Sequence, residues 1–250
     1  MTLQAEPDLT PPALPPPRRR RGRLIAVVVL VILGVACAAG GAVTLVRELT
    51  RSATKAEIAA AQAEEIATRW ERLPAGKIFP ARISYQNEEG VTTSATLVGI
   101  APQASCQAAL APAAYSQIRA LGCRTMLRAT YLDASGTLAT TVGLAAMPSP
   151  RAASSAQGDL VGQAPSAGLD AVPFAGTMAE DFGDAQRGAA GAQFDGPYLF
   201  LYTAGYTDGL PGAAATGNLE LGALGAGVLG AIEPVLISHG STCSEKDIKC

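Results

Sequence analysis

Five cysteines offer the clearest chemistry in this 250-residue sequence. Cys37 lies in an apolar run near the N-terminus, and the other four are Cys106, Cys123, Cys243 and Cys250. Four cysteines in an oxidising compartment favour two disulfides, for which three pairings are possible. We expect Cys106 to pair with Cys123 and Cys243 to pair with Cys250. Zinc binding is the competing interpretation, but the chain has no Cys-x-x-Cys pair and a single histidine.

Catalytic motifs occur only as isolated strings. Gly225, Gly227 and Gly230 spell a dinucleotide-binding fingerprint, but no clear strand precedes them and little chain follows for a ribose-binding acid. The sequence contains neither a Gly-x-Ser-x-Gly elbow nor a Walker loop. We therefore expect no catalytic residue and no cofactor. The remaining nucleophile and base candidates, which lack an evident orienting partner, are Ser238, His239 and Ser241.

Two acidic groups could attract a divalent cation, because hard ions prefer carboxylate ligands. One group consists of Glu180, Asp181 and Asp184, and the other is the pair Glu88–Glu89. Neither has the spacing of a calcium-binding loop, and solvated loops account for both. We therefore expect no metal-ligating residue.

An aromatic face is predicted on the strand at 197–206, where alternate residues share one side. Such a face could bind a glycan or a peptide, but an antiparallel sheet also buries one face, and aromatic side chains fill it. The core interpretation is the preferred one, and the binding face is the alternative. The residues that share the face are Tyr198, Phe200, Tyr202 and Tyr206.

Composition limits both the partners and the core. The net charge is −2, with a basic stretch over residues 1–23 and an acidic balance after residue 75, so we expect no nucleic-acid partner. Hydrophobic residues make up 48% of the chain, but aromatic residues make up only 5% and Gly occurs 27 times. Any core must therefore be built mainly from small side chains.

Residues 24–46 form an uncharged apolar run. As a helix the run would extend about 34 Å, enough for a hydrocarbon core of about 30 Å, so we predict a transmembrane helix in a lipid bilayer. More basic residues precede the run than follow it, which favours a single-pass protein with a cytoplasmic N-terminus. A cleaved or lipidated segment near Cys37 is the alternative. The topogenic arginines are Arg18, Arg19, Arg20, Arg21 and Arg23.

Two different segments flank the predicted span. Residues 1–23 are rich in Pro and Arg, which predicts a disordered cytoplasmic tail. Residues 47–73 are rich in Ala, Glu and Arg without Gly or Pro, which predicts a helical stalk ended by Pro74. An Ala seam along this stalk would let two helices approach closely, so a homodimer through the stalk is a further expectation.

Residues 77–250 predict an extracytoplasmic α+β domain. The clearest hairpin joins strands at 123–132 and 137–146. We predict an antiparallel sheet with helices on one face, stapled by the disulfides. Residues 148–170 indicate a linker or a weak helix. Further strands are expected at 78–85, 95–100, 171–176 and 197–206, and helices at 112–121 and 219–232, the last ended by Pro234.

Two stretches carry a resemblance to known proteins. They are CRTMLRATYLDASGTLATTVGLAAMP at 123–148 and GPYLFLYTAGYTDGLP at 196–211. Together with the Arg cluster and the apolar run, they resemble actinobacterial, streptomycete-like single-pass membrane proteins with an extracytoplasmic domain. The resemblance implies no catalytic residues. Leu210 follows Asp208–Gly209 where that group often has Arg, so no role of such an Arg carries over to this chain.

These observations favour a membrane-anchored extracytoplasmic accessory or sensor-like binding module without enzymatic activity. An envelope protein is the expected kind of partner. A subunit of a larger envelope complex is one alternative, supported by the Ala seam and by small residues in the span. An atypical extracytoplasmic hydrolase is the other alternative, and it would require turnover that depends on residues such as His239 or Ser241.

Overall fold

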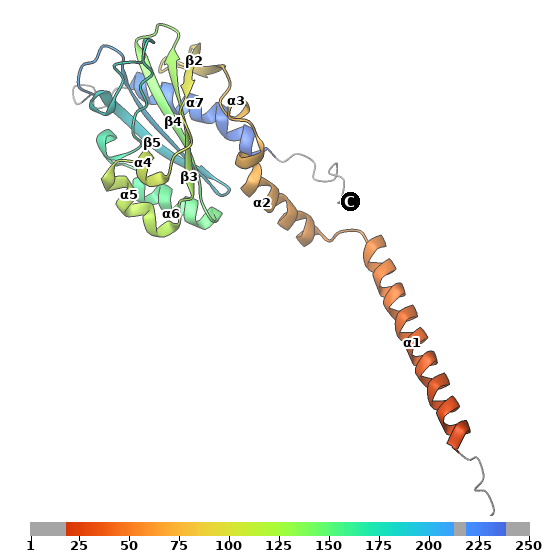
Figure 1. The fold of residues 1–250 in the computed structure, drawn as a ribbon. Helices are drawn as coiled ribbons and strands as arrows, with labels where there is room; N and C mark the ends of the chain where they lie inside the picture. Colours follow the sequence, from red (N-terminus) through yellow and green to blue (C-terminus); the bar gives the residue numbers. More distant parts are fainter. Residues whose placement is uncertain (1–18, 213–218, 239–250) are drawn as a thin grey trace, which may run out of the picture. The chain divides into compact units, whose positions relative to one another are not determined.

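The computed structural model describes residues 19–212 and 219–238, which separate into one long helix and a compact α+β domain that begins at Thr54 (Figure 1). Helix α1 (Arg19–Thr50) contains the predicted span. Its segment Gly22–Thr50 has 29 residues, an 18-residue window of mean hydropathy 2.8 and no buried side chain. By length and composition, this segment can cross a membrane.

The predicted stalk is not one continuous helix. Helix α1 ends at Thr50, and helix α2 (Lys55–Arg72) begins after Thr54. The Glu57 N–H donates to the Thr54 hydroxyl at 3.3 Å, and the Thr54 N–H donates to the Glu57 carboxylate at 2.7 Å. These reciprocal bonds form a capping box, which starts a new helix at this point. The expectation of an unbroken helix over 47–73 is therefore corrected.

Six antiparallel strands form one sheet in the order β1-β2-β3-β4-β6-β5. Strands β1 and β5 are the two edges, and helix α7 (Leu219–Ile237) contacts both of them, so the sheet curves around this helix. The strands are β1 (Arg82–Gln86), β2 (Thr92–Ile100), β3 (Thr125–Asp133), β4 (Leu138–Ala146), β5 (Arg187–Asp195) and β6 (Tyr198–Tyr206).

Strands β3 and β4 confirm the predicted hairpin. The Asp133 carboxylate shapes its turn by accepting hydrogen bonds from the N–H groups of Ser135, at 2.9 Å, and Leu138, at 2.8 Å. The first strand begins later than expected, because Ile78 ends the short helix α3 (Ala75–Ile78) and Pro80 follows it. A proline lacks the N–H that a strand ladder needs.

The predicted strand at 171–176 is wrong, and β5 forms instead. In the segment 171–176, the Val172 N–H donates to the Thr141 hydroxyl at 2.9 Å, and Pro173 has no N–H for a ladder. Strand β5 consists largely of Gly and Ala, which have little intrinsic preference for strands. Its pairing with β6, one residue after another up to the Gly196 turn, makes it a strand.

Helices cover both faces of the sheet, which corrects the expectation of helices on one face. On one face α7 packs around Leu224, Val228 and Ile232, each no more than 1% exposed. On the other face, short helices build a second core. All nine residues of the central strand β4 are buried as a result. The helices on the second face are α4 (Cys106–Ala109), α5 (Pro112–Ile118), the 3-10 turn η1 (Arg119–Leu121) and α6 (Pro150–Leu160).

Helix α6 falls in the segment for which a linker or a weak helix was the expectation. The Ser149 hydroxyl accepts from the Ala152 N–H at 3.2 Å, and Pro150 occupies the first helical turn. Both features are typical of helix N-termini. Ala153, Ala156 and Leu160 are buried against the sheet, so the segment belongs to the second core.

Helix α7 runs through Pro234 to Ile237, so the predicted helix end at Pro234 is wrong. Proline removes one backbone donor, and the carbonyl that loses it belongs to the exposed Gly230, where water can bind. Gly225 and Gly227 face the sheet. A Cβ at Gly225 would lie 2.1 Å from the Tyr202 ring, so this glycine serves close packing rather than nucleotide binding.

The Cys106–Cys123 disulfide is confirmed. It joins the first residue of α4 to the segment before β3, with a Cα–Cα distance of 6.2 Å. Cys106 is buried in the second core. Cys37 is an exposed free thiol on α1. The predicted Cys243–Cys250 pair lies outside the described residues.

Candidate functional site

The predicted aromatic face divides into a buried and a partly buried half. Tyr198 and Phe200 are fully buried and meet edge to face, with ring centroids 6.2 Å apart. The Tyr198 hydroxyl donates to the Ile66 carbonyl of α2 and accepts from the Trp70 N–H at 3.3 Å. Burial raises the pKa of Tyr198 to about 12, so the phenol stays neutral. Tyr198 therefore attaches α2 to the sheet, and neither ring presents a surface to a ligand.

Tyr202 and Tyr206 are only partly buried. The Tyr202 ring lies between Gly191 of β5 and Gly225 of α7, where added Cβ atoms would come within 2.3 Å and 2.1 Å of it. Burial raises the pKa of Tyr202. The small residues on either side thus let the ring reach toward the outer edge of β5.

Two hollows flank that edge. The first has a volume of about 330 Å³ and lies between the loop after α6, at Val161 to Ala164, and Ala190 and Ala192 of β5. The second has a volume of about 500 Å³ and lies between β5 and the α7 residues Gly222 and Ala226. Ala190 and Tyr202 line both hollows, and neither lining contains a charged residue. Such surfaces suit contact with small apolar groups.

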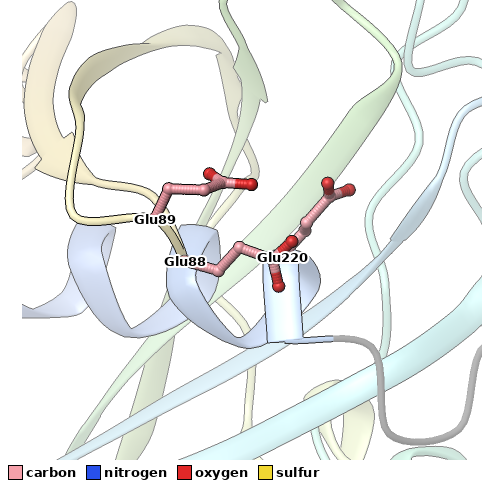
Figure 2. Close-up of side chains that lie close together, drawn as sticks. All are labelled: Glu88, Glu89 and Glu220. Carbon is pink, nitrogen blue, oxygen red and sulfur yellow. The ribbon is translucent and has the colours of Figure 1, made fainter.

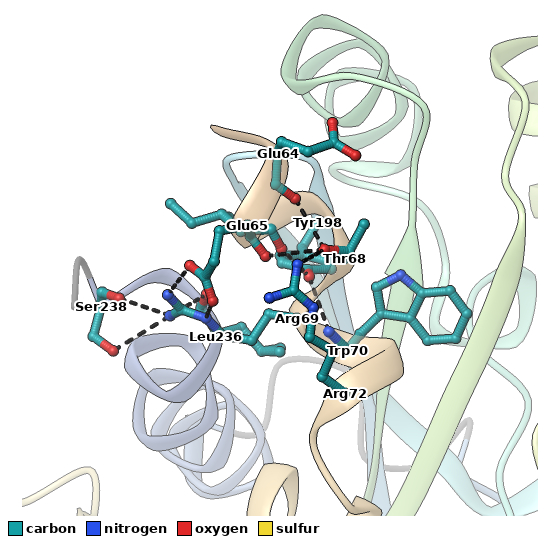
Figure 3. Close-up of polar contacts among 10 residues, drawn as sticks. Glu64, Glu65, Thr68, Arg69, Trp70, Arg72, Tyr198, Leu236 and Ser238 are labelled. Atoms are coloured by element: carbon teal, nitrogen blue, oxygen red, sulfur yellow. Dashed lines mark hydrogen bonds and ion pairs between the residues drawn. The ribbon is translucent and has the colours of Figure 1, made fainter. Parts of the chain in front are cut away.

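Arg69 of α2 binds the end of α7 (Figure 3). Its guanidinium donates to the carbonyls of Leu236, at 2.8 Å, and Ser238, at 2.7 Å, and its Nε donates to Glu65 Oε1 at 2.9 Å. A cation at a helix C-terminus is stabilised by the unpaired carbonyls there. The side chains of Arg69 and Glu65 are only 11% and 19% exposed, so the contact is shielded from solvent. It fixes α2 to the domain.

We expect the Glu65–Arg69 pair to stabilise the fold in a pH-dependent way. The hydrogen bond from Arg69 lowers the pKa of Glu65 below its ordinary value of 4.5, although burial acts in the opposite direction. A lowered carboxyl pKa stabilises the fold above the unfolded-state value, and this contribution is lost as the pH falls through the folded-state value. Glu65→Gln should therefore lower the melting temperature at about pH 7, and by much less at about pH 3.

The control for this measurement is Glu64→Gln, on the exposed side of the same helix. It should change the melting temperature little at either pH. Thermal unfolding of the full chain followed by circular dichroism gives both comparisons. An effect of Glu65→Gln that is the same size at both pH values would contradict the role given to the charged carboxylate.

Three carboxylates meet at one end of the sheet (Figure 2). Oxygen atoms of Glu88, Glu89 and Glu220 lie within 4.8 Å of one another, and all three residues are exposed. Desolvation and the nearby Glu89 raise the pKa of Glu88. The sequence indicated the pair at 88–89 but not Glu220, which α7 brings to it from a distant part of the chain. Exposed acidic groups of this kind are common and do not by themselves make a metal site.

Glu180 and Asp184, two members of the predicted acidic group, accept hydrogen bonds from different backbone N–H groups. Glu180 accepts from the Gly176 N–H at 2.9 Å, whereas Asp184 accepts from the Ala171 N–H at 2.8 Å. Asp184 also lies 3.4 Å from the guanidinium of Arg187, a buried arginine that sequence analysis did not single out. Glu180 and Asp184 thus bind different parts of the loop and do not converge on an ion. Of the C-terminal candidates, Ser238 bonds to Arg69, and His239 and Ser241 lie outside the described residues.

No protein-family model, curated protein or solved structure matches the chain.

Proposed function

We propose that the chain is a membrane-anchored extracytoplasmic binding module that acts as an accessory or sensor-like component of the cell envelope, without enzymatic activity of its own. The observation that carries this proposal is the separation of α1 from the domain. The segment Gly22–Thr50 buries none of its apolar side chains, and a separate compact unit follows it. A lipid bilayer provides the environment that such a helix needs.

Two further features support the location and the role. The Cys106–Cys123 disulfide is a stable feature in an oxidising compartment and not in the cytoplasm. The hollows beside β5 are lined by Gly, Ala and other uncharged residues, a composition suited to contact with another molecule and poorly suited to proton transfer. The arginines ahead of the span, from Arg18 to Arg23, favour a cytoplasmic N-terminus and therefore an extracytoplasmic domain.

Residues after α1 should be accessible from outside the cell. We would introduce Thr10→Cys and, separately, Ser155→Cys into a chain carrying Cys37→Ala, Cys243→Ser and Cys250→Ser. Position 155 lies on the exposed side of α6. A membrane-impermeant maleimide should label position 155 in intact cells and position 10 only after lysis. The opposite pattern would overturn the proposed topology.

The same preparations address the enzymatic alternative. The purified full-length protein, in detergent, should not turn over ester, peptide or glycan substrates. Turnover that is lost on His239→Ala or Ser241→Ala would replace the binding module with a hydrolase.

A further inference from the structure

Among the described residues, strand β5 has a free edge. It pairs with β6 on one side only, because it stands last in the sheet order. The Ala189 carbonyl faces β6, where it accepts from the Thr203 hydroxyl at 3.5 Å. Facing directions alternate along an antiparallel strand, so Ala190 and Ala192 direct their N–H and C=O groups away from the sheet. Within residues 19–212 and 219–238, no hydrogen bond from another element reaches these groups.

The sequence of this edge does not protect it from pairing. Natural edges are commonly shielded by Lys, by Pro or by a bulge that twists the strand away. Between Ala189 and Gln193 the strand holds only Gly and Ala, and its one register shift lies earlier, between Arg187 and Ala189. The strand itself therefore presents no charge and no large side chain along this stretch, and the 3-10 turn at Pro165–Ala167 packs beside its first residues.

The hollows lie where the side chains of an added strand would point. Successive side chains of a strand alternate between the two faces of a sheet. The 330 Å³ hollow lies on the α6 side of β5, and the 500 Å³ hollow lies on the α7 side. Both include Ala190, so together they border the same stretch of edge. Alternate apolar side chains of a partner would enter one hollow and then the other.

Each of the two elements that border the second hollow, β5 and α7, carries a carboxylate farther along its length: Asp195 on β5 and Glu233 on α7. Farther along α7 lies Glu233, whose carboxylate accepts from Gln193 Nε2 of β5 at 2.7 Å. Burial and the neighbouring Asp195 raise the pKa of Glu233. In the described part of the chain, neither Glu233 nor Asp195 forms an ion pair with Lys or Arg. A cationic side chain placed here would relieve the repulsion between the two acids.

We propose that the outer edge of β5 binds an extended segment of an envelope protein, which adds to the sheet as a further strand, with small apolar side chains in the two hollows and a Lys or Arg beside Asp195 and Glu233. Backbone hydrogen bonds along the edge supply affinity, and the hollows and the carboxylates supply selectivity. This inference rests on the proposed extracytoplasmic binding function and names the kind of partner.

A defined peptide tests the site on the full-length protein in lipid nanodiscs. The probe is a fluorescent, capped octapeptide in which Val and Ser alternate between two terminal Lys residues, so that either strand direction places a cation near Glu233. Its partner peptide has Glu in place of both Lys. Fluorescence anisotropy should show saturable binding of the Lys peptide, and binding of the Glu peptide that is weaker by about tenfold or more.

Two variants locate the binding. Ala226→Leu fills the hollow on the α7 side from an exposed position and should weaken binding of the Lys peptide by about tenfold. Ala113→Leu, the same exchange on the exposed side of α5, is the matched control and should leave binding unchanged. Glu233→Lys should abolish the preference, because the new cation lies beside Asp195, so that this variant binds both peptides equally. Unchanged melting temperatures would show that each variant is folded.

Four outcomes would overturn the proposal. Equal binding of both peptides to the unaltered protein would remove the role of the carboxylates. Binding that Ala226→Leu leaves intact would place the site elsewhere. Dimerisation of the chain that Ala226→Leu abolishes, without competition by the peptide, would make a second copy the occupant. Failure of the peptide to bind while position 155 is still labelled from outside would reject this site and leave the proposed function standing.

Discussion

Replacing both Cys106 and Cys123 with Ala should lower the free energy of unfolding by about 3 kcal/mol, because their disulfide closes a loop and so restricts the unfolded chain. The two residues are 17 positions apart, and the fold places Cys106 in the core between the short helices and the sheet. That core contains many Ala side chains, which bury little area each. About 3 kcal/mol is a large part of the roughly 5–15 kcal/mol that stabilises a typical domain.

Urea unfolding of the full chain, monitored by circular dichroism, would measure this loss. Cys37→Ala is the control, since that thiol is free and lies on α1, which is not part of the compact domain. Removing Cys243 and Cys250 together should cost less, because their loop is shorter. Peptide mapping without reduction comes first. A fragment in which Cys106 is joined to Cys243 or Cys250 would contradict both the pairing and the ranking.

Two glycine-to-alanine changes in the same helix should have opposite effects. At Gly225 a methyl group would lie 2.1 Å from the Tyr202 ring, which is itself held against β5. We expect Gly225→Ala to destabilise the domain by about 1–3 kcal/mol, the usual cost of overpacking. At Gly230 no atom beyond the adjoining residues and the backbone of the helix itself lies within 4 Å of the added methyl, and Ala is the better helix former. Gly230→Ala should therefore stabilise by up to about 1 kcal/mol.

The two variants carry the same substitution in the same helix and would be unfolded under the same conditions. The difference between their unfolding midpoints therefore reports the contact with Tyr202. Gly225→Ala combined with Tyr202→Ala should recover part of the loss, because the small side chain leaves room for the methyl group. Equal effects of the two single variants would show that α7 does not present Gly225 to the sheet.

The parts of the fold that could be predicted are those with local signals. The hairpin at 123–146 has alternating apolar residues and an Asp-to-Gly turn, and β3 and β4 form there. The pairing of Cys106 with Cys123 was predicted because it would join the start of a helix to the next strand. The apolar run at 24–46 lies within one helix, although its place in a membrane remains a proposal.

The missed elements lack such signals. Strand β5 has Gly and Ala where a recognisable strand has β-branched or aromatic residues, so only its pairing with β6 reveals it. Coverage of both sheet faces could be inferred from β4, since neither of its two alternating faces carries a charge. The same pattern also fits a strand with one face of small residues exposed to solvent. Because Ala is common throughout the chain, the sequence does not distinguish a strand covered on both faces from one covered on a single face.

The candidate binding site depends on the order of the strands. The loop after α6, strand β5 and the start of α7 come together only because β5 pairs outside β6. Arg69 meets Ser238 across a separation of 169 residues, and Glu220 meets Glu88 in a similar way. No periodicity or spacing within a short window can indicate such neighbours.

The position of α7 in the chain determines when the domain can fold. This helix fills the face of the sheet around which the strands curve, and it contacts β1, yet β1 begins at residue 82 and α7 at residue 219. Contacts over so great a sequence separation form late and slow the folding of a domain. During synthesis the strands are completed before α7, so the face of the sheet that α7 covers in the folded domain stays exposed until α7 has been made. That interval is the stage at which chaperones protect the nascent chain or proteases remove it.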